Sequence, residues 1–126
     1  MYYLLALKMY VNAQSNTSPR TYNDTRIVEM GDYNAVRAEV TVFSWSAGAP
    51  GTATVDVATT VSDDMENWKQ VGSTQSIAGV SPSYTLLNAI TGINARYVRL
   101  ELSAADNGEG GSVFAIIGAG LNLAKL

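Results

Sequence analysis

The stretch VRAEVTVFSW, residues 36–45, alternates apolar and polar side chains with a period of two. The small and branched apolar residues share one face: Val36, Ala38, Val40 and Val42. The opposite face begins polar and ends aromatic, with Arg37, Glu39, Thr41, Phe43 and Trp45. Because successive side chains of a strand point to opposite faces, this pattern predicts a half-buried β-strand whose outer face is aromatic at one end.

The same period of two recurs on either side of this stretch, and no segment repeats at the helical period. Further strands are predicted over residues 2–11, 52–62, 68–71, 74–77, 83–87, 96–102 and 112–123. The turn-rich residues 46–51 predict a hairpin between 36–44 and 52–62, and 12–24 reads as a polar loop. We therefore expect an all-β, antiparallel, jelly-roll-like sandwich of about eight strands, formed by residues 1–126 as a single domain.

The first and last predicted strands, residues 2–11 and 112–123, are apolar on both faces. A sandwich strand buries only one face in its own core. We therefore expect these two strands to lie side by side and their outward side chains to contact another subunit. The predicted interface residues are Tyr2, Leu4, Tyr10, Phe114 and Ile116.

The composition limits the kinds of partner. Apolar residues make up 47% of the chain and charged residues only 15%, with a net charge of −3. The eight basic residues are scattered, which argues against nucleic-acid binding. The apolar start is interrupted by Lys8 and has no basic region or small-residue cleavage site, which argues against a membrane span or signal peptide. We expect synthesis in the cytoplasm and a surface suited to proteins or sugars.

The residues that most catalytic sites require are missing. The chain has no His and no Cys, which excludes the Ser-His-Asp and Cys-His arrangements and makes zinc binding unexpected. The acidic residues that could hydrolyse a glycoside or bind Ca²⁺ lie in polar turns: Asp63, Asp64, Glu66, Asp106 and Glu109. Their spacing matches no calcium loop. We expect no enzymatic activity, no cofactor and no metal.

Two motifs carry a family resemblance. In residues 61–71, Ser62, Asp64, Trp68 and Val71 match an S-x-D-G-x-x-W-x-x-V hairpin, and residues 94–100 contain A-R-Y-V-R. This third of the chain resembles discoidin-like (coagulation factor C-type) jelly-roll sandwiches, whose motifs recur in carbohydrate-binding modules and in structural proteins of bacterial viruses. Met65 stands where the family has its turn glycine. The resemblance implies the architecture and no ligand.

The same residues support a local prediction that needs no family. Ser62 and Asp64 are expected to accept backbone N–H groups in the turn, and Trp68 to fold back on the sheet. Arg96 and Arg99 are expected to pair with carboxylates on neighbouring strands.

Two functions remain open. The first is a structural assembly protein that works through protein contacts or self-association, such as the head-decoration or tail subunit of a bacterial virus particle. The alternative is a discoidin-like glycan-binding module, with Phe43 and Trp45 at the rim of the ligand site.

Overall fold

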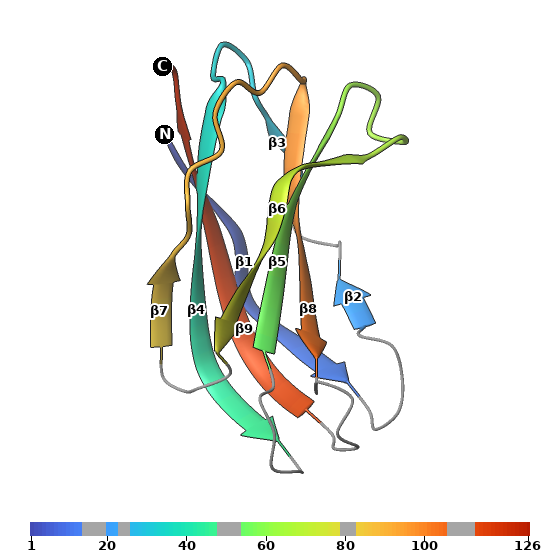
Figure 1. Ribbon diagram of the computed structural model, residues 1–126, viewed down its shortest axis with the longest axis vertical. Coiled ribbons are helices and arrows are strands. Elements are labelled where there is room, and N and C mark those ends of the chain that lie inside the picture. Colours follow the sequence, from blue (N-terminus) through green and yellow to red (C-terminus); the bar gives the residue numbers. More distant parts are fainter. Residues whose placement is uncertain (14–19, 23–25, 48–53, 79–82, 106–112) are drawn as a thin grey trace.

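The computed structural model describes residues 1–13, 20–22, 26–47, 54–78, 83–105 and 113–126. Within these residues, nine strands form two antiparallel sheets (Figure 1). The first sheet has the order β1-β9-β4-β7, with β1 Tyr2–Ala13, β9 Val113–Ala124, β4 Ala35–Ala47 and β7 Ser83–Leu86. The second has the order β2-β8-β5-β6, with β2 Arg20–Tyr22, β8 Tyr97–Ala105, β5 Thr54–Ser62 and β6 Lys69–Ala78. The short β3, Val28–Glu29, also pairs with β8.

The pairing of the strands is that of a jelly roll. Strands from the two ends of the chain pair first, β1 with β9 and β2 with β8, and the inner strands then pair as β4 with β7 and β5 with β6. Such nested pairs, folded over into two sheets, define the jelly-roll sandwich. The predicted fold class is therefore confirmed.

The core lies between the two sheets and follows the predicted alternation. Val36, Ala38, Val40 and Val42 of β4 are all at most 5% exposed. From the second sheet, β8 contributes a row of fully buried residues, Val98, Leu100 and Leu102. The inward positions of both strands were thus predicted correctly, because the period of two fixes which side chains share a face.

The predicted hairpin between residues 36–44 and 52–62 is wrong. β4 and β5 lie in different sheets, because both edges of β4 are paired with β7 and β9, while both edges of β5 are paired with β6 and β8. A strand has only two edges, so these partners leave no place for a β4–β5 pair. A turn-rich segment between two alternating strands does not distinguish a hairpin from a connection between sheets.

Two further strand predictions need correction. Residues 12–24 are not all loop, because β1 continues to Ala13 and β2 occupies Arg20–Tyr22. The separate strands predicted at 68–71 and 74–77 form one strand, β6, with a register shift where Val71 and Gln75 pair with Thr59 and Val57. Gly72 lies within this irregularity at φ 69°, a conformation that glycine adopts at little cost.

The prediction that the terminal strands lie side by side is confirmed, since β1 and β9 pair antiparallel along most of their length. The Met1 ammonium donates to the Leu123 carbonyl at 2.8 Å, and the Leu123 N–H donates to the Met1 carbonyl at 2.7 Å. Both ends of the chain therefore lie at the same end of the sandwich (Figure 1).

Candidate interaction surface

The first sheet turns a largely apolar face away from the core. Among the side chains that the structure describes on its strands, seven large ones remain between 37% and 61% exposed: Tyr2, Leu4, Phe43, Tyr84, Leu86, Phe114 and Ile116. We call this set the outer face. Four of its members, from β1 and β9, were predicted at the sequence level. Contiguous exposed apolar side chains of this kind are typical of interaction sites.

The fifth predicted interface residue, Tyr10, has a side chain outside the described set. Its backbone pairs with Ile116 in the β1–β9 ladder. The sequence analysis missed Tyr84 and Leu86 as interface residues. Only the pairing of β7 with β4, which sets Tyr84 across from Thr41 and Leu86 across from Glu39, brings them onto this face.

The outer face contains a chain of contacts that crosses the sheet from β1 to β7. The Tyr2 ring lies over Gly120, where an added Cβ would stand 2.5 Å from the tyrosine oxygen. The Tyr2 hydroxyl hydrogen-bonds to Glu39, and the Tyr84 hydroxyl donates to Glu39 Oε2 at 2.7 Å. Glu39 is therefore held between two phenols.

These contacts shift the acidity of both phenols. Desolvation, followed by the hydrogen bond to Glu39 and its negative charge, raises the pKa of Tyr2. The hydrogen bond to Glu39 is the main cause that raises the pKa of Tyr84. Both hydroxyls thus stay protonated and remain donors to the carboxylate at neutral pH.

A shallow depression of about 100 Å³ lies beside this array. Its floor is formed by residues 118–120 of β9, and its walls by Tyr2, Leu4, Glu39, Thr41 and Phe43. Gly118 and Gly120 contribute no side chains to it, and the Tyr2 ring already covers the space above Gly120. The depression has the size to accept part of one apolar side chain and is too small for a drug-sized ligand.

The two residues expected at a ligand rim have different surroundings. Phe43 is 44% exposed and belongs to the outer face, whereas Trp45 is half-buried and packs against the core. A register shift between Val42 and Ser44 in the β4–β9 ladder separates them and changes the alternation. Phe43 is thus the one of the two that a partner can reach directly.

The turn between β5 and β6 is held by the side chains predicted to hold it. Ser62 Oγ accepts the N–H groups of Asp64 at 3.2 Å and Met65 at 2.9 Å. Asp64 Oδ1 accepts the N–H groups of Glu66 at 2.9 Å and Asn67 at 2.8 Å. These bonds lower the pKa of Asp64 well below its usual range, the backbone donors most strongly. Side chains of the turn itself thus accept these backbone N–H groups. Met65 adopts a φ of 62° within the turn.

Of the other acidic residues considered for catalysis or Ca²⁺, the structure describes Asp63 and Glu66. Asp63 Oδ1 accepts the Arg96 N–H at 3.1 Å, which ties the turn to the start of β8. Within the described ranges, no three acidic side chains lie close enough to hold a metal ion. Asp106 and Glu109 lie outside the described residues.

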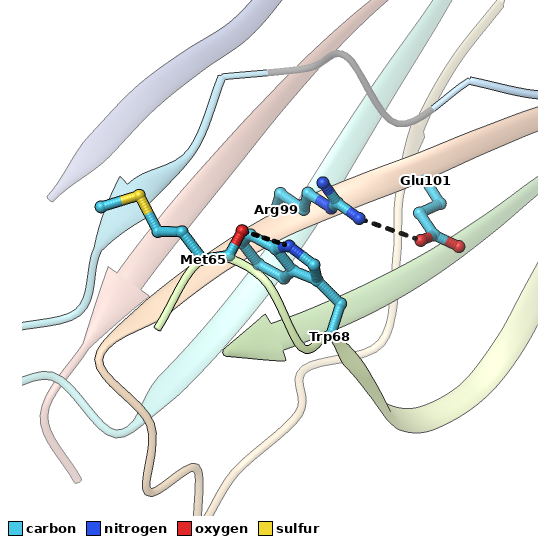
Figure 2. Close-up of polar contacts among 4 residues, drawn as sticks. All are labelled: Met65, Trp68, Arg99 and Glu101. Atoms are coloured by element: carbon cyan, nitrogen blue, oxygen red, sulfur yellow. Dashed lines mark hydrogen bonds and ion pairs between the residues drawn. The ribbon is translucent and has the colours of Figure 1, made fainter. Parts of the chain in front are cut away.

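Trp68 packs on the outward side of the second sheet, as Figure 2 shows. The Arg99 guanidinium lies 3.9 Å from the centre of its ring, and the indole N–H donates to the Met65 carbonyl at 3.2 Å. Arg99 also pairs with Glu101 at 3.6 Å. The carboxylate that pairs with Arg99 therefore lies on the same strand, β8, and not on a neighbouring strand as expected. The Arg96 guanidinium lies over the Tyr97 ring, 5.4 Å from its centre. Because the Arg99 side chain is only 14% exposed, we interpret Trp68, Arg99 and Glu101 as side chains that pack on the sheet and not as a ligand site.

A cleft of about 480 Å³ lies at one end of the sandwich, among the residues that the structure describes. It is lined by residues from 61–72 and from Ile90–Ala95, including Asp63, Asn67, Lys69 and Asn94. No aromatic side chain lines it. It therefore lacks the flat ring on which a sugar would stack.

Comparison with known proteins shows a similarity of fold alone. No protein-family model matches the chain, and no curated protein matches it. Among solved structures, it is similar to a mutant VP2 protein of infectious bursal disease virus in derived T=1 particles, with a TM-score of 0.61 and 10% identity over 96% of this chain and 31% of that one.

A structure of infectious bursal disease virus, strain Gx, gives a TM-score of 0.57 with 8% identity, covering 96% of this chain and 32% of that one. A VP2 subviral particle of the same virus gives 0.50 with 11% identity, covering 99% and 38%. The chain spans about a third of the length of these viral chains. At such low identity the similarity supports the jelly-roll sandwich, and it does not bear on the discoidin-like resemblance.

The described residues contain no helix with the length and apolar character needed to cross a membrane.

Proposed function

We propose that this chain is a non-enzymatic structural subunit that acts through protein–protein contacts, and that the outer face is its contact surface. The observation that carries the proposal is the row of exposed aromatic and aliphatic side chains on β1, β9, β4 and β7. Interfaces are enriched in aromatic residues and depleted of charge at their centres. Among the strand side chains described on this sheet, the charged ones are only Arg37 and Glu39.

The finer proposal is a component of a virus particle. It is supported by the sandwich fold that the chain shares with the VP2 particles described above. A bacterial virus, with the chain as a head-decoration or tail subunit, is the narrower form. Since the virus of those structures is not a bacterial one, this form rests on the motifs in residues 61–71 and 94–100.

A matched set of variants tests the contact surface. Sedimentation velocity at increasing protein concentration should show association of the parent chain. The double substitution Phe114→Ser and Ile116→Ser should weaken it, because each apolar side chain buried in an interface contributes roughly 1.5–3 kcal/mol. Ile27→Ser is the control, because Ile27 is 38% exposed, close to the 37% of Ile116, and precedes β3 of the second sheet.

The proposal predicts that the control associates like the parent. Equal association of all three proteins, or a parent that stays monomeric, would contradict it. Thermal melts distinguish a lost contact from a lost fold, since the serine variants should melt cooperatively.

The alternative function, a glycan-binding module, is favoured by Phe43 and Tyr84, which are exposed beside the hydrogen-bonding groups of Glu39 and Thr41. A glycan array probed with the parent and with Phe43→Ala decides between the two. Saturable binding that Phe43→Ala abolishes would favour the module.

A further inference from the structure

The strand at one edge of the first sheet, β7, directs backbone hydrogen-bonding groups away from its neighbour. The Leu87 N–H, which directly follows β7, donates to the Ala38 carbonyl of β4 at 2.9 Å. In an antiparallel pair, the residues of a strand alternate between bonding to the neighbouring strand and pointing away from it. Thr85 therefore also bonds to β4, whereas Tyr84 and Leu86 point their N–H and C=O groups at the free edge. No hydrogen bond between described residues takes up these backbone groups.

The edge formed by β7 is also the most regular one. The order of the strands places β1 and β7 at the ends of the first sheet and β2 and β6 at the ends of the second. The ladders of β1 and β6 contain register shifts, and β2 has three residues, whereas β7 pairs with β4 without a shift. Irregular edges resist pairing with another chain. In Figure 1, β7 forms the left margin of the molecule, with β4 and β6 to its right.

We propose that β7 pairs antiparallel with β7 of a second copy of this chain, about a two-fold axis that passes through Thr85 perpendicular to the sheet. Tyr84 of each copy then lies opposite Leu86 of the other, and the two four-stranded sheets join edge to edge. A two-fold axis makes both contacts at once, as isologous interfaces require. This contact goes beyond the proposed function, because it uses the edge of the sheet and not the outer face.

The register follows from the backbone groups on either side of Thr85. With the axis there, Tyr84 and Leu86 bond to each other across the junction, and each N–H has an acceptor. An axis at Tyr84 would set Leu86 opposite residue 82, a proline without an N–H. An axis at Leu86 would set Tyr84 opposite Asn88, whose N–H already donates to a glutamine side chain at 2.9 Å. The edge is thus complementary to itself in one register, which favours a second copy as the partner.

The side chains on this edge match in the same register. Tyr84 and Leu86 are 61% and 49% exposed. Side chains directly opposite each other in an antiparallel ladder lie about 4.5–5.5 Å apart and stabilise the pairing. Each Tyr84 would therefore pack beside the partner's Leu86. The contact is small compared with a stable dimer interface. We expect it to join copies at high concentration or within an assembly, and not to hold a pair together in dilute solution.

Disulfide trapping at high protein concentration tests the pairing. The chain has no Cys, so Thr85→Cys introduces a single thiol. Opposite residues of a pair without mutual hydrogen bonds have Cα atoms about 4.5 Å apart, a distance that a disulfide spans. With oxidised glutathione as the oxidant, Thr85→Cys should form a covalent dimer at least about tenfold faster than Ile27→Cys, because paired thiols react at a raised effective concentration. The control residue is 38% exposed and precedes β3 of the second sheet.

A proline substitution distinguishes backbone pairing from random collision. In the Thr85→Cys chain, Leu86→Pro removes an N–H that the partner would accept and that β4 does not use. It should slow trapping to the rate of Ile27→Cys. Leu86→Ala is the matched control, because it also loses the side chain but keeps the N–H, and it should still be trapped faster than Ile27→Cys. Circular dichroism melts check that each variant is folded, and Tyr84→Pro replaces Leu86→Pro if the latter is not.

Fast trapping that the proline removes supports the β7 pair. Trapping of Thr85→Cys that is no faster than that of Ile27→Cys overturns it, and so does fast trapping that the proline leaves unchanged. The proposed function is judged separately, by the Phe114→Ser, Ile116→Ser variant. If that variant associates like the parent, the outer face fails as a contact surface, while the trapping rates still decide the β7 pair.

Discussion

Met65 adopts a left-handed backbone conformation that side chains with a Cβ rarely take. Its φ of 62° falls at the position where the resembling family has glycine, so the backbone keeps the turn although the residue differs. Such a conformation costs roughly 1–3 kcal/mol for a residue other than glycine. The hydrogen bonds that the Met65 and Glu66 N–H groups donate to Ser62 Oγ and Asp64 Oδ1 maintain it.

Replacing Met65 with Gly should therefore stabilise the protein by about 0.5–1 kcal/mol, because the relief of strain exceeds the added entropy of the unfolded chain. Little packing is lost, since Met65 is 48% exposed. Denaturant melts measure the change, and Met65→Ala, which keeps the strain, should give no gain. A destabilised glycine variant would contradict the strain argument.

Asp64 makes the stability of the turn dependent on pH. Its pKa in the folded chain lies far below the ordinary value of 3.8, so the unfolded state takes up the proton first as the pH falls. The stabilisation is complete above the unfolded pKa and is lost as the pH falls through the folded pKa.

The parent should therefore be more stable than Asp64→Asn at neutral pH, and the difference should narrow as the pH falls from about 4 to about 2. Thermal melts across this range measure it. Glu66→Gln is the control, since the described residues provide no hydrogen bond to that carboxylate. If the difference in stability between the parent and Asp64→Asn does not change with pH, the charge of Asp64 does not stabilise the turn.

At the scale of the strands, Gly120 of β9 and Tyr2 of β1 are in contact, and the position of the Tyr2 ring requires the absence of a side chain at residue 120. The ring covers the glycine and reaches Glu39 on the next strand. Gly120→Ala should cost at most about 1 kcal/mol, because the new methyl group displaces the far end of the Tyr2 ring, which is half exposed and can move aside.

A double-mutant cycle with Tyr2→Ala checks this prediction. Once the ring is gone, Gly120→Ala should cost much less, so the two substitutions should not be additive. Additive costs would show that the Tyr2 ring does not limit position 120.

At the scale of the whole molecule, association through the outer face links stability to concentration. A protein that associates only when folded is stabilised by mass action. The melting temperature of the parent should therefore rise by about 2–4 °C for a tenfold increase in concentration. The same increase should leave the Phe114→Ser, Ile116→Ser variant unchanged. A parent whose melting temperature is independent of concentration would argue against a folded dimer.

The sequence alone determined where most of the long strands lie and, in β4 and β8, which side chains point inward. The alternation at 36–45 and 96–102 was sufficient, because the period of two is a local property of the extended backbone. The apolar character of both terminal strands likewise predicted their pairing and four exposed residues of the outer face. Turn chemistry at Ser62 and Asp64 is also local, since each contact spans three residues or fewer.

Only the tertiary structure decided which strands are neighbours. It set β4 and β5 in different sheets and β7 beside β4, which added Tyr84 and Leu86 to the outer face. It also brought Tyr2, Gly120, Glu39 and Tyr84 from four different strands into one array. The physical reason is that every strand has two equivalent edges and an alternating pattern marks only its faces. The partner at each edge is therefore chosen by how all the strands together bury one core.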